Sequence, residues 1–446
     1  MEMRKNAPKL DFRKYFEILR DIDPVERSGK VMKVVGLTVE SNGPAVNMGN
    51  ICRIYPSKGD KYVEAEVVGF NDQRVLLMPF GDMSGIGFGS RVVSTGKSLS
   101  VPVSQKLIGR VLNALGEPID GGEEIIAEGY YPVDGQPPDP LSRKRIKEEF
   151  PLGIKAIDGL LTVGQGQRLG IFAGSGVGKS TLLGMIARYA VADVNVIVLV
   201  GERGREVNDF IEKDLGPTGL KKSVLIVATS DQPALLRLKA ALVGTSIAEY
   251  FRDQGKKVLL LMDSVTRFAM AQREIGMAVG EPPVSRGFPP SVYSILPKLL
   301  ERSGTSDKGS ITGLYAVLVE GDDLNEPISD TVRGILDGHI VLSRSLATQN
   351  HYPAIDVLQS VSRVMKDIVP KEQYNHASYI KSVMATYKNA KDLIDIGAYK
   401  AGSNAEIDEA IRLNPSINKF LCQQMDESVT YDEVKAEMFS IGRDSK

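Results

Sequence analysis

Hydrophobic and polar positions change their pattern twice along the chain. Residues 29–95 hold short β-type runs broken by Gly, Asn, Asp and Pro, which predicts a small antiparallel barrel. Residues 151–370 alternate continuous apolar runs with helical stretches, which predicts a parallel sheet covered on both faces. The runs in the two regions are 29–38, 51–54, 61–70 and 74–79, then 168–172, 194–200, 224–228, 258–262 and 312–319. After Pro370 such runs stop, and the remainder has the pattern of helices with turns at Gly397 and 401–404.

These patterns divide the chain into four parts. An N-terminal segment, 1–28, precedes the barrel at 29–95, and a third part at 96–374 begins with a Pro- and Gly-rich connector over 96–150. The helical part is 375–446. Within the first segment, apolar residues recur at helical spacing over 11–22, which predicts an amphipathic helix. This helix either docks a partner or packs on its own protein, and the pattern is compatible with both.

Composition narrows the class of protein. The 55 Lys and Arg residues balance 56 Asp and Glu residues, so nothing indicates a nucleic-acid or membrane-surface partner. Two cysteines lack metal-type spacing and fit a reducing compartment, and three histidines make a histidine-built metal site unexpected. The N-terminus has no apolar core for a signal peptide, and no apolar run is long enough to span a bilayer. We therefore expect a cytoplasmic protein without a transmembrane segment.

The strongest chemical signal is residues 171–181, with the sequence IFAGSGVGKST. A short apolar strand runs into a glycine-rich turn and then a helix, which is the pattern of a phosphate-binding loop. Glycines allow backbone N–H groups to converge on phosphate oxygens, while Lys179 reaches the β- and γ-phosphates and Ser180 can ligate Mg²⁺. The first position of the strict motif is Ala173 rather than Gly, but Gly174 and Gly176 keep the turn flexible.

An acidic residue ends the apolar run at 258–262. Asp263 would lie at the carboxyl end of a parallel strand, where such sheets bind ligands, and could hold a water of the Mg²⁺ shell. A strand-terminal Asp can also be a simple helix cap. Its occurrence downstream of a phosphate-binding loop favours the metal role.

A charged cluster follows the apolar run at 194–200. Glu202 would point into the same crevice as Lys179 and is the candidate to orient and polarise an attacking water. Arg203 is a candidate γ-phosphate contact, and Glu206 a candidate support for the waters on Mg²⁺. Without the phosphate-binding loop, alternating charges of this kind would suit a surface salt-bridge cluster equally well.

A fourth segment, 351–363, ends in Arg363 far from the loop in sequence. An arginine at a subunit boundary can stabilise the charge that develops on a neighbour's γ-phosphate. It can equally be an ordinary interface arginine, and physical reasoning from the sequence does not decide between the two.

With these motifs in place, the chain resembles the catalytic subunits of the rotary ATPase superfamily and, within it, the flagellar type III export ATPases. The segments GIKAIDGL at 153–160, GERGRE at 201–206 and PAIDVLQSVS at 353–362 occur in the family's order. The resemblance covers nearly the whole chain. It implies an α/β fold: a RecA-like P-loop core with a parallel sheet, preceded by a small antiparallel β-barrel and followed by a C-terminal helical domain.

The resemblance also implies roles for individual residues. Glu202 becomes the water-activating base, Arg203 a γ-phosphate contact and Arg363 an arginine finger given to the adjacent subunit. Tyr352 matches the aromatic residue stacked on adenine, and Phe420 falls near a second adenine contact, while Met425 replaces the next aromatic. Mg²⁺ is expected near Ser180, Asp263 and Glu206. Residues expected to bind ATP or ADP through the loop are Gly174, Ser175, Gly176, Val177, Gly178, Lys179, Ser180 and Thr181.

The function implied is Mg²⁺-dependent ATP hydrolysis by a homo-hexameric ring that energises flagellar protein export. The expected partners are a stator-like regulator on the N-terminal segment, a central stalk protein, the export gate and chaperone–substrate complexes. Recruitment to the cytoplasmic face of the membrane export apparatus would follow. The segments 321–344 and 397–408 favour export, because the latter lacks the acidic rotor-contact cluster of a synthase β subunit.

Four alternatives remain at this stage. The nearest is the homologous ATPase of a virulence injectisome, which would share every site residue. A rotary synthase subunit is disfavoured by the segment at 397–408, and a hexameric helicase by the near-zero net charge. A scaffold that only binds nucleotide is disfavoured by Glu202.

Overall fold

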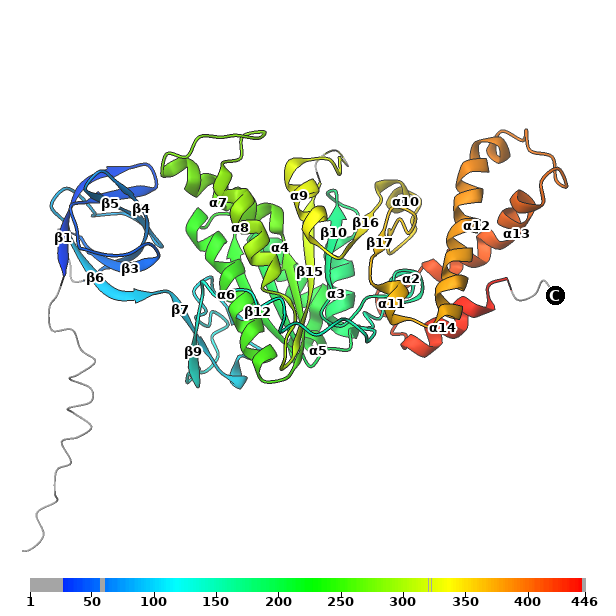
Figure 1. Ribbon diagram of the computed structural model, residues 1–446, viewed down its shortest axis with the longest axis horizontal. Helices are drawn as coiled ribbons and strands as arrows, with labels where there is room; N and C mark the ends of the chain where they lie inside the picture. Colours follow the sequence, from blue (N-terminus) through cyan, green and yellow to red (C-terminus); the bar gives the residue numbers. More distant parts are fainter. Residues whose placement is uncertain (1–26, 57–60, 320, 322, 443–446) are drawn as a thin grey trace, which may run out of the picture. The chain divides into compact units, whose positions relative to one another are not determined.

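The computed structural model describes residues 27–56, 61–319, 321 and 323–442. The chain forms two compact units, one ending at Ser98 and the other beginning at Leu99. The amphipathic helix predicted at 11–22 lies outside the described residues. Figure 1 shows the two units and the order of their elements along the chain.

The first unit is a closed antiparallel barrel with the strand order β1-β2-β5-β4-β3-β6. Alternating side chains point inward and form a separate core that includes Val31, Ile54 and Leu77, all fully buried. The barrel is therefore the one predicted for residues 29–95, with β2 and β6 added to the expected runs. Its strands are β1 Ser28–Val35, β2 Thr38–Ser41, β3 Asn50–Tyr55, β4 Val63–Asn71, β5 Arg74–Pro79 and β6 Arg91–Ser98.

The second unit is built on a nine-stranded sheet with the order β17-β16-β10-β15-β13-β11-β12-β8, and β14 added to β15. Strands β10, β11, β12, β13 and β15 run parallel, as the continuous apolar runs predicted, and β8 and β16 are parallel strands that those runs did not include. The sheet strands are β8 Val111–Leu112, β10 Arg168–Ala173, β11 Val194–Glu202, β12 Ser223–Thr229, β13 Lys257–Asp263, β14 Gly304–Thr305, β15 Ser310–Leu318, β16 Gly338–Leu342 and β17 Val361–Ser362.

Helices cover this sheet, and α6 packs on β11, β12 and β13. The connector predicted over 96–150 contains a two-stranded sheet of β7 Ser100–Val103 and β9 Gly129–Pro132 together with η1 Gln105–Leu107. The helices of this part are α2 Lys155–Leu160, α3 Lys179–Tyr189, α4 Gly204–Asp209, η2 Phe210–Leu215, α5 Gly216–Leu220, α6 Ala234–Asp253, α7 Val265–Ala278, α8 Pro290–Glu301, α9 Pro327–Ile335, α10 Arg344–Thr348 and α11 Met365–Ile368.

Three helices form the C-terminal part: α12 Lys371–Asp395, α13 Ala405–Leu421 and α14 Tyr431–Ser440. The turn between α12 and α13 contains Gly397 at φ 71°, and Asn404 caps α13 by accepting backbone N–H bonds from Glu406 and Ile407. One apolar cluster runs from Phe150 through the sheet to Ile441, so the helices share a core with the P-loop part. The α/β fold with a barrel before it and helices after it is confirmed.

Candidate active site

The glycine-rich loop lies where β10 ends and α3 begins. Gly176 and Gly178 have φ of 77° and 85°, a region that residues with a Cβ adopt only under strain. Gly178 precedes Lys179, the first residue of α3, so the positive end of that helix points into the loop. Ser175, Gly176 and Ser180 are exposed, and the loop is therefore open to an anionic ligand.

Three charged side chains meet beside this loop because β10, β13 and β11 end at the same edge of the sheet. The Lys179 ammonium forms an ion pair with Asp263, which is only 4% exposed, and its Nζ lies 3.6 Å from Oε1 of Glu202. Burial alone would lower the pKa of Lys179, but the charges of Asp263 and Glu202 outweigh burial and raise it. The lysine is therefore a fixed cation at the site predicted to receive phosphate.

Glu202 is the carboxyl group best placed for proton transfer. Burial raises its pKa to about 7, with the charge of Asp263 adding to the effect and a hydrogen bond with Glu206 contributing further. A general base works best when its pKa is close to the operating pH. The Glu202 carboxylate therefore has both the location and the proton affinity to polarise a water molecule.

Arg203 and Glu206 occupy the outer part of this region. The Arg203 side chain is 81% exposed, and its Nη1 lies 3.4 Å from Oε1 of Glu206, which is half exposed. In this structure Arg203 thus forms an exposed ion pair with Glu206. Glu206 does reach Glu202, whereas the predicted γ-phosphate contact of Arg203 requires its side chain to turn inward.

Mg²⁺ fits the residues that surround the loop. The exposed Ser180 hydroxyl lies at the start of α3, and the Asp263 carboxylate lies beside Lys179. Among the described residues no group of three or more His, Cys, Asp or Glu side chains could hold an ion by itself. The site therefore suits an ion that is held chiefly by substrate phosphates and water, as Mg²⁺ commonly is. Thr181, beside Ser180, hydrogen-bonds to Asp214.

The aromatic residue predicted to stack on adenine lies next to the loop. Tyr352 is 41% exposed, and a Cβ placed on Gly178 would lie 3.4 Å from its Cε1. The carbonyl of Met425 accepts hydrogen bonds from Nη2 of Arg188 at 2.6 Å and from the hydroxyl of Tyr189 at 3.2 Å, which ties the segment around Met425 to the end of α3. The exposed ring of Tyr352 thus lies beside the loop, whereas the backbone of Met425 contacts the far end of α3.

Phe420 requires a correction. It was expected near the adenine, but it is 1% exposed and its ring fills the space over Gly159 of α2. Leu413, Ile417, Phe420 and Leu421 are all buried on one face of α13, so helical periodicity places Phe420 in the core. The structure does not bring Phe420 to the loop.

Arg363 lies at the other end of the sheet. The loop follows the carboxyl end of β10, whereas Arg363 follows β17, which pairs with β16 through Gly338 at the amino end of the parallel strands. Arg363 is exposed, and its backbone N–H donates to the Asp337 carbonyl at 3.1 Å. Arg363 is therefore separated from its own loop by the length of β10, about 20 Å for six residues.

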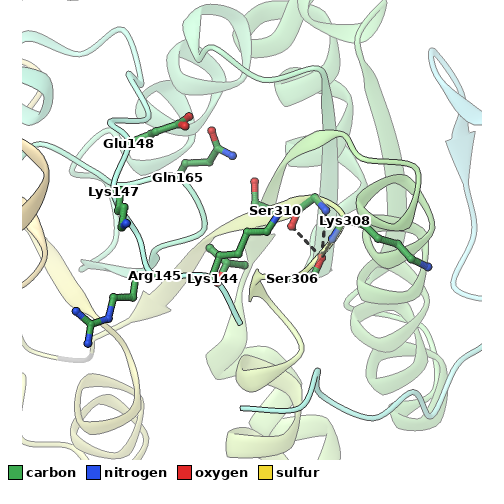
Figure 2. Close-up of a pocket in the computed structure, with 10 residues that line it drawn as sticks. Lys144, Arg145, Lys147, Glu148, Gln165, Ser306, Lys308 and Ser310 are labelled. Carbon is green, nitrogen blue, oxygen red and sulfur yellow. Dashed lines mark hydrogen bonds between the residues drawn. The ribbon is translucent and has the colours of Figure 1, made fainter. Parts of the chain in front are cut away.

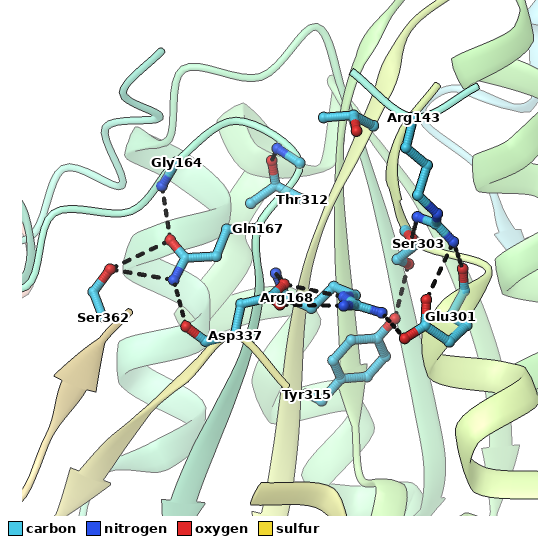
Figure 3. Close-up of polar contacts among 12 residues, drawn as sticks. Arg143, Gly164, Gln167, Arg168, Glu301, Ser303, Thr312, Tyr315, Asp337 and Ser362 are labelled. Atoms are coloured by element: carbon cyan, nitrogen blue, oxygen red, sulfur yellow. Dashed lines mark hydrogen bonds and ion pairs between the residues drawn. The ribbon is translucent and has the colours of Figure 1, made fainter. Parts of the chain in front are cut away.

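A hydrogen-bonded network fixes this amino-terminal edge (Figure 3). Nε and Nη2 of Arg168 donate to the two carboxylate oxygens of Asp337 at 3.0 and 3.1 Å, and Nη1 pairs with Glu301 at 2.5 Å. The neighbouring Gln167 amide connects Gly164, Asp337 and Ser362.

A pocket of about 420 Å³ lies at the same edge (Figure 2). It is formed by the connector and by the turn between β14 and β15, and none of the predicted site residues lines it. Its lining residues are Lys144, Arg145, Lys147, Glu148, Gln165, Thr305, Ser306, Lys308, Gly309 and Ser310.

Gln423 is a functional candidate that the sequence did not reveal. It is 4% exposed, and its side chain accepts the Lys155 N–H while donating to the carbonyls of Gly153 and Glu427, each at 2.9 Å. Its backbone N–H donates to the Tyr352 carbonyl at 3.0 Å. A lone Gln after a helix carries no pattern that predicts such contacts.

A loop that cradles phosphate, a buried lysine, a strand-terminal aspartate and a poised glutamate together define a P-loop nucleoside triphosphatase. Family models match the chain in three places. They are the nucleotide-binding domain of the ATP synthase alpha/beta family at 153–362, the beta-barrel domain of that family at 31–96 and the T3SS EscN ATPase C-terminal domain at 369–440.

Individual relatives agree with these matches. The flagellum-specific ATP synthase of Bacillus subtilis is 56% identical over 94% of this chain and 96% of its own length. The type 3 secretion system ATPase of Xanthomonas euvesicatoria is 51% identical over 94% and 95%, respectively. The assembled ATPase EscN of enteropathogenic E. coli superimposes with a TM-score of 0.88 at 48% identity, covering 93% of this chain and 99% of that chain. The chain therefore belongs to the ATP synthase alpha/beta family, and within it to the ATPases of flagellar and type III secretion systems.

Proposed function

We propose that this ATPase works as a homo-hexameric ring whose active sites each combine residues of two neighbouring subunits. The observation that carries the proposal is the position of Arg363, which is exposed at the edge of the sheet opposite its own loop. A head-to-tail ring brings one edge of a subunit against the opposite edge of the next. Arg363 can then serve only a neighbour's nucleotide, and EscN, a relative with the same fold, is described as assembled.

Each residue has a distinct task in hydrolysis. Lys179 and the backbone N–H groups of 174–181 bind the β- and γ-phosphates of ATP, and Tyr352 stacks on the adenine. Glu202 accepts a proton from water as the water attacks the γ-phosphorus in line with the departing ADP. Arg363 of the neighbour stabilises charge on the transferred group. Ser180 and Asp263 would hold Mg²⁺, which would neutralise part of the phosphate charge.

The biological task is to energise type III protein export for flagellar assembly. The flagellum-specific relative from Bacillus subtilis is 56% identical over nearly the whole chain, which supports a flagellar rather than an injectisome role. EscN has been solved with its central stalk EscO, which supports an analogous stalk partner here. The regulator on residues 1–28, the export gate and chaperone–substrate complexes complete the expected partners, with recruitment from the cytoplasm to the membrane export apparatus. None of the helices among the described residues is long and apolar enough to cross a membrane.

Complementation between two inactive variants tests the shared site. Lys179→Ala removes a subunit's own phosphate contact but leaves its Arg363 available to a neighbour, and Arg363→Ala does the reverse. Mixed rings should regain up to about one quarter of wild-type turnover, because random mixing pairs the two intact halves at that fraction of interfaces. Lack of recovery in mixed rings of confirmed composition would rule out a site shared in this way.

Disruption of the gene in its source bacterium tests the export role. Loss of flagellin secretion and of motility, restored by the wild-type gene but not by Glu202→Gln, is the expected result. Normal flagella combined with lost secretion of virulence effectors would assign the chain to an injectisome instead.

A further inference from the structure

Gln167 lies at the point where β10 begins, and β10 ends in the phosphate-binding loop. Its side chain is fully buried. The amide oxygen accepts the Gly164 N–H at 2.8 Å, and the amide nitrogen donates to the Asp337 carbonyl at 3.0 Å and to the Ser362 hydroxyl at 3.2 Å. One side chain therefore connects the strand of the loop to both segments that flank Arg363 (Figure 3).

These contacts fix the backbone of Arg363 from two directions. The Asp337 carbonyl that accepts from Gln167 also accepts the Arg363 N–H at 3.1 Å. Ser362, the residue before Arg363, donates its hydroxyl proton to the Thr162 carbonyl at 2.8 Å while accepting from Gln167. By contrast, among the residues that the structure describes, the Arg363 guanidinium has a single hydrogen bond, from Nη2 to the Arg333 carbonyl at 3.4 Å. The backbone of Arg363 is thus fixed by hydrogen bonds, while its guanidinium is free to contact a neighbouring subunit.

We propose that Gln167 is a positioning residue for Arg363 of its own chain, so that β10 carries the subunit's own phosphate loop at one end and, at the other, the support of the arginine that this subunit gives to its neighbour's site. This inference rests on the proposed ring. A misplacement of about 1 Å of a catalytic group can lower a rate roughly 100-fold, so the placement of the Arg363 backbone matters for turnover. Gln167 itself touches no substrate.

The complementation experiment can show whether Gln167 matters in the subunit that donates the arginine or in the subunit that binds the nucleotide. Gln167→Leu removes every hydrogen bond of this side chain with little change in size. In the Lys179→Ala chain, which donates the arginine, this substitution should lower turnover of mixed rings roughly tenfold or more. In the Arg363→Ala chain, which has no arginine to position, the same substitution should leave the turnover of mixed rings nearly unchanged.

Thr312→Val is the matched control. Thr312 is fully buried at the same edge and accepts the Gly166 N–H through its hydroxyl at 2.9 Å, but it has no contact with Ser362 or Asp337 among the hydrogen bonds of the described residues. Its replacement removes one buried hydrogen bond of the same region. Equal turnover in the two backgrounds is expected for this variant.

A second pair of variants, at Ser362, tests the same proposal if the Gln167→Leu chain does not fold. Ser362→Ala in the donor background should lower turnover of mixed rings, whereas Ser362→Thr, which keeps the hydroxyl, should restore most of it. Equal losses in donor and acceptor backgrounds, or no loss with Ser362→Ala, would overturn the role of Gln167 while leaving the shared site intact. Failure of the two parent variants to complement would instead overturn the shared site itself.

Discussion

Two carboxyl groups beside Lys179 have different surroundings in this structure. Asp263 is paired directly with the Lys179 ammonium, whereas Glu202 is farther away and has its pKa raised toward neutrality by burial and by Asp263. Opposite environments of neighbouring acids commonly divide their roles in catalysis. In the proposed mechanism, the division gives charge and metal binding to Asp263 and proton transfer to Glu202.

Glu202→Gln should therefore separate binding from hydrolysis. The amide keeps the shape of the side chain but cannot accept a proton from water, so turnover should fall about 10²- to 10⁴-fold. Affinity for ADP, measured by calorimetry, should change little. Glu212→Gln, which changes an exposed acid on η2, is the control and should hydrolyse ATP at the wild-type rate. A Glu202→Gln enzyme with near-normal turnover would exclude Glu202 as the base.

The pH profile should report the same group. A carboxyl whose pKa is raised to about 7 is protonated, and thus inactive as a base, below that pH. Since kcat/KM reflects ionisations of the free enzyme, it should rise with pH up to about 7 and then level off. Glu206→Ala should move the inflection to lower pH, because Glu206 contributes to the raised pKa. A profile that is flat through neutral pH would contradict this assignment.

At the scale of single elements, the position of α3 depends on the close contact between its Gly184 and Asp214 of η2. A Cβ on Gly184 would lie 2.6 Å from the Cβ and the carbonyl oxygen of Asp214, which belongs to η2. Gly184→Ala should therefore push the helix that carries Lys179 away from η2. Overpacking of this kind costs about 1–3 kcal/mol, measurable as a lower free energy of unfolding in a denaturant titration.

Gly334→Ala provides the comparison within the same unit. Gly334 lies in α9, and a Cβ there meets no atom within 4 Å. The substitution should stabilise by roughly 0.5–1 kcal/mol, because alanine loses less conformational freedom in a helix. A similar loss of stability in both variants would show that Gly184 is not a packing constraint.

Elements also show how far the sequence predicts the structure. β10, β11, β12, β13 and β15 were recognisable because strands buried on both faces are continuous apolar runs. β16, Gly338–Leu342, went unrecognised because its five residues begin with Gly and His. Lys179, Glu202 and Asp263 were brought together as expected, since Glu202 and Asp263 end recognisable strands and Lys179 begins the helix that follows the loop after a third. Gln167 and Gln423 were not found, because a single polar residue has no periodicity and its partners are remote in sequence.

At the scale of the whole molecule, the chain divides into two compact units. The barrel has a hydrophobic core of its own, and one core of the larger unit includes residues from Phe150 to Ile441. Because compact units commonly unfold cooperatively, calorimetry should resolve two transitions. ADP with Mg²⁺ should raise the melting temperature of the larger unit alone. The corresponding stabilisation is about 2.7 kcal/mol at a ligand concentration 100 times Kd.

The isolated barrel, residues 27–98, supplies the control for this assignment. Its melting temperature should match one transition of the full chain and should not respond to nucleotide. A single transition in the full chain that shifts as a whole with nucleotide would contradict two units that unfold independently.

Gln423 links the helical part of the chain directly to Tyr352, the residue predicted to stack on adenine. It holds the carbonyl of Tyr352 with its backbone and the start of α2 with its side chain, all from the segment that joins α13 to α14. Under the proposed function, a ligand bound to that segment would therefore be linked to Tyr352 and to the start of α2 through the hydrogen bonds of a single residue.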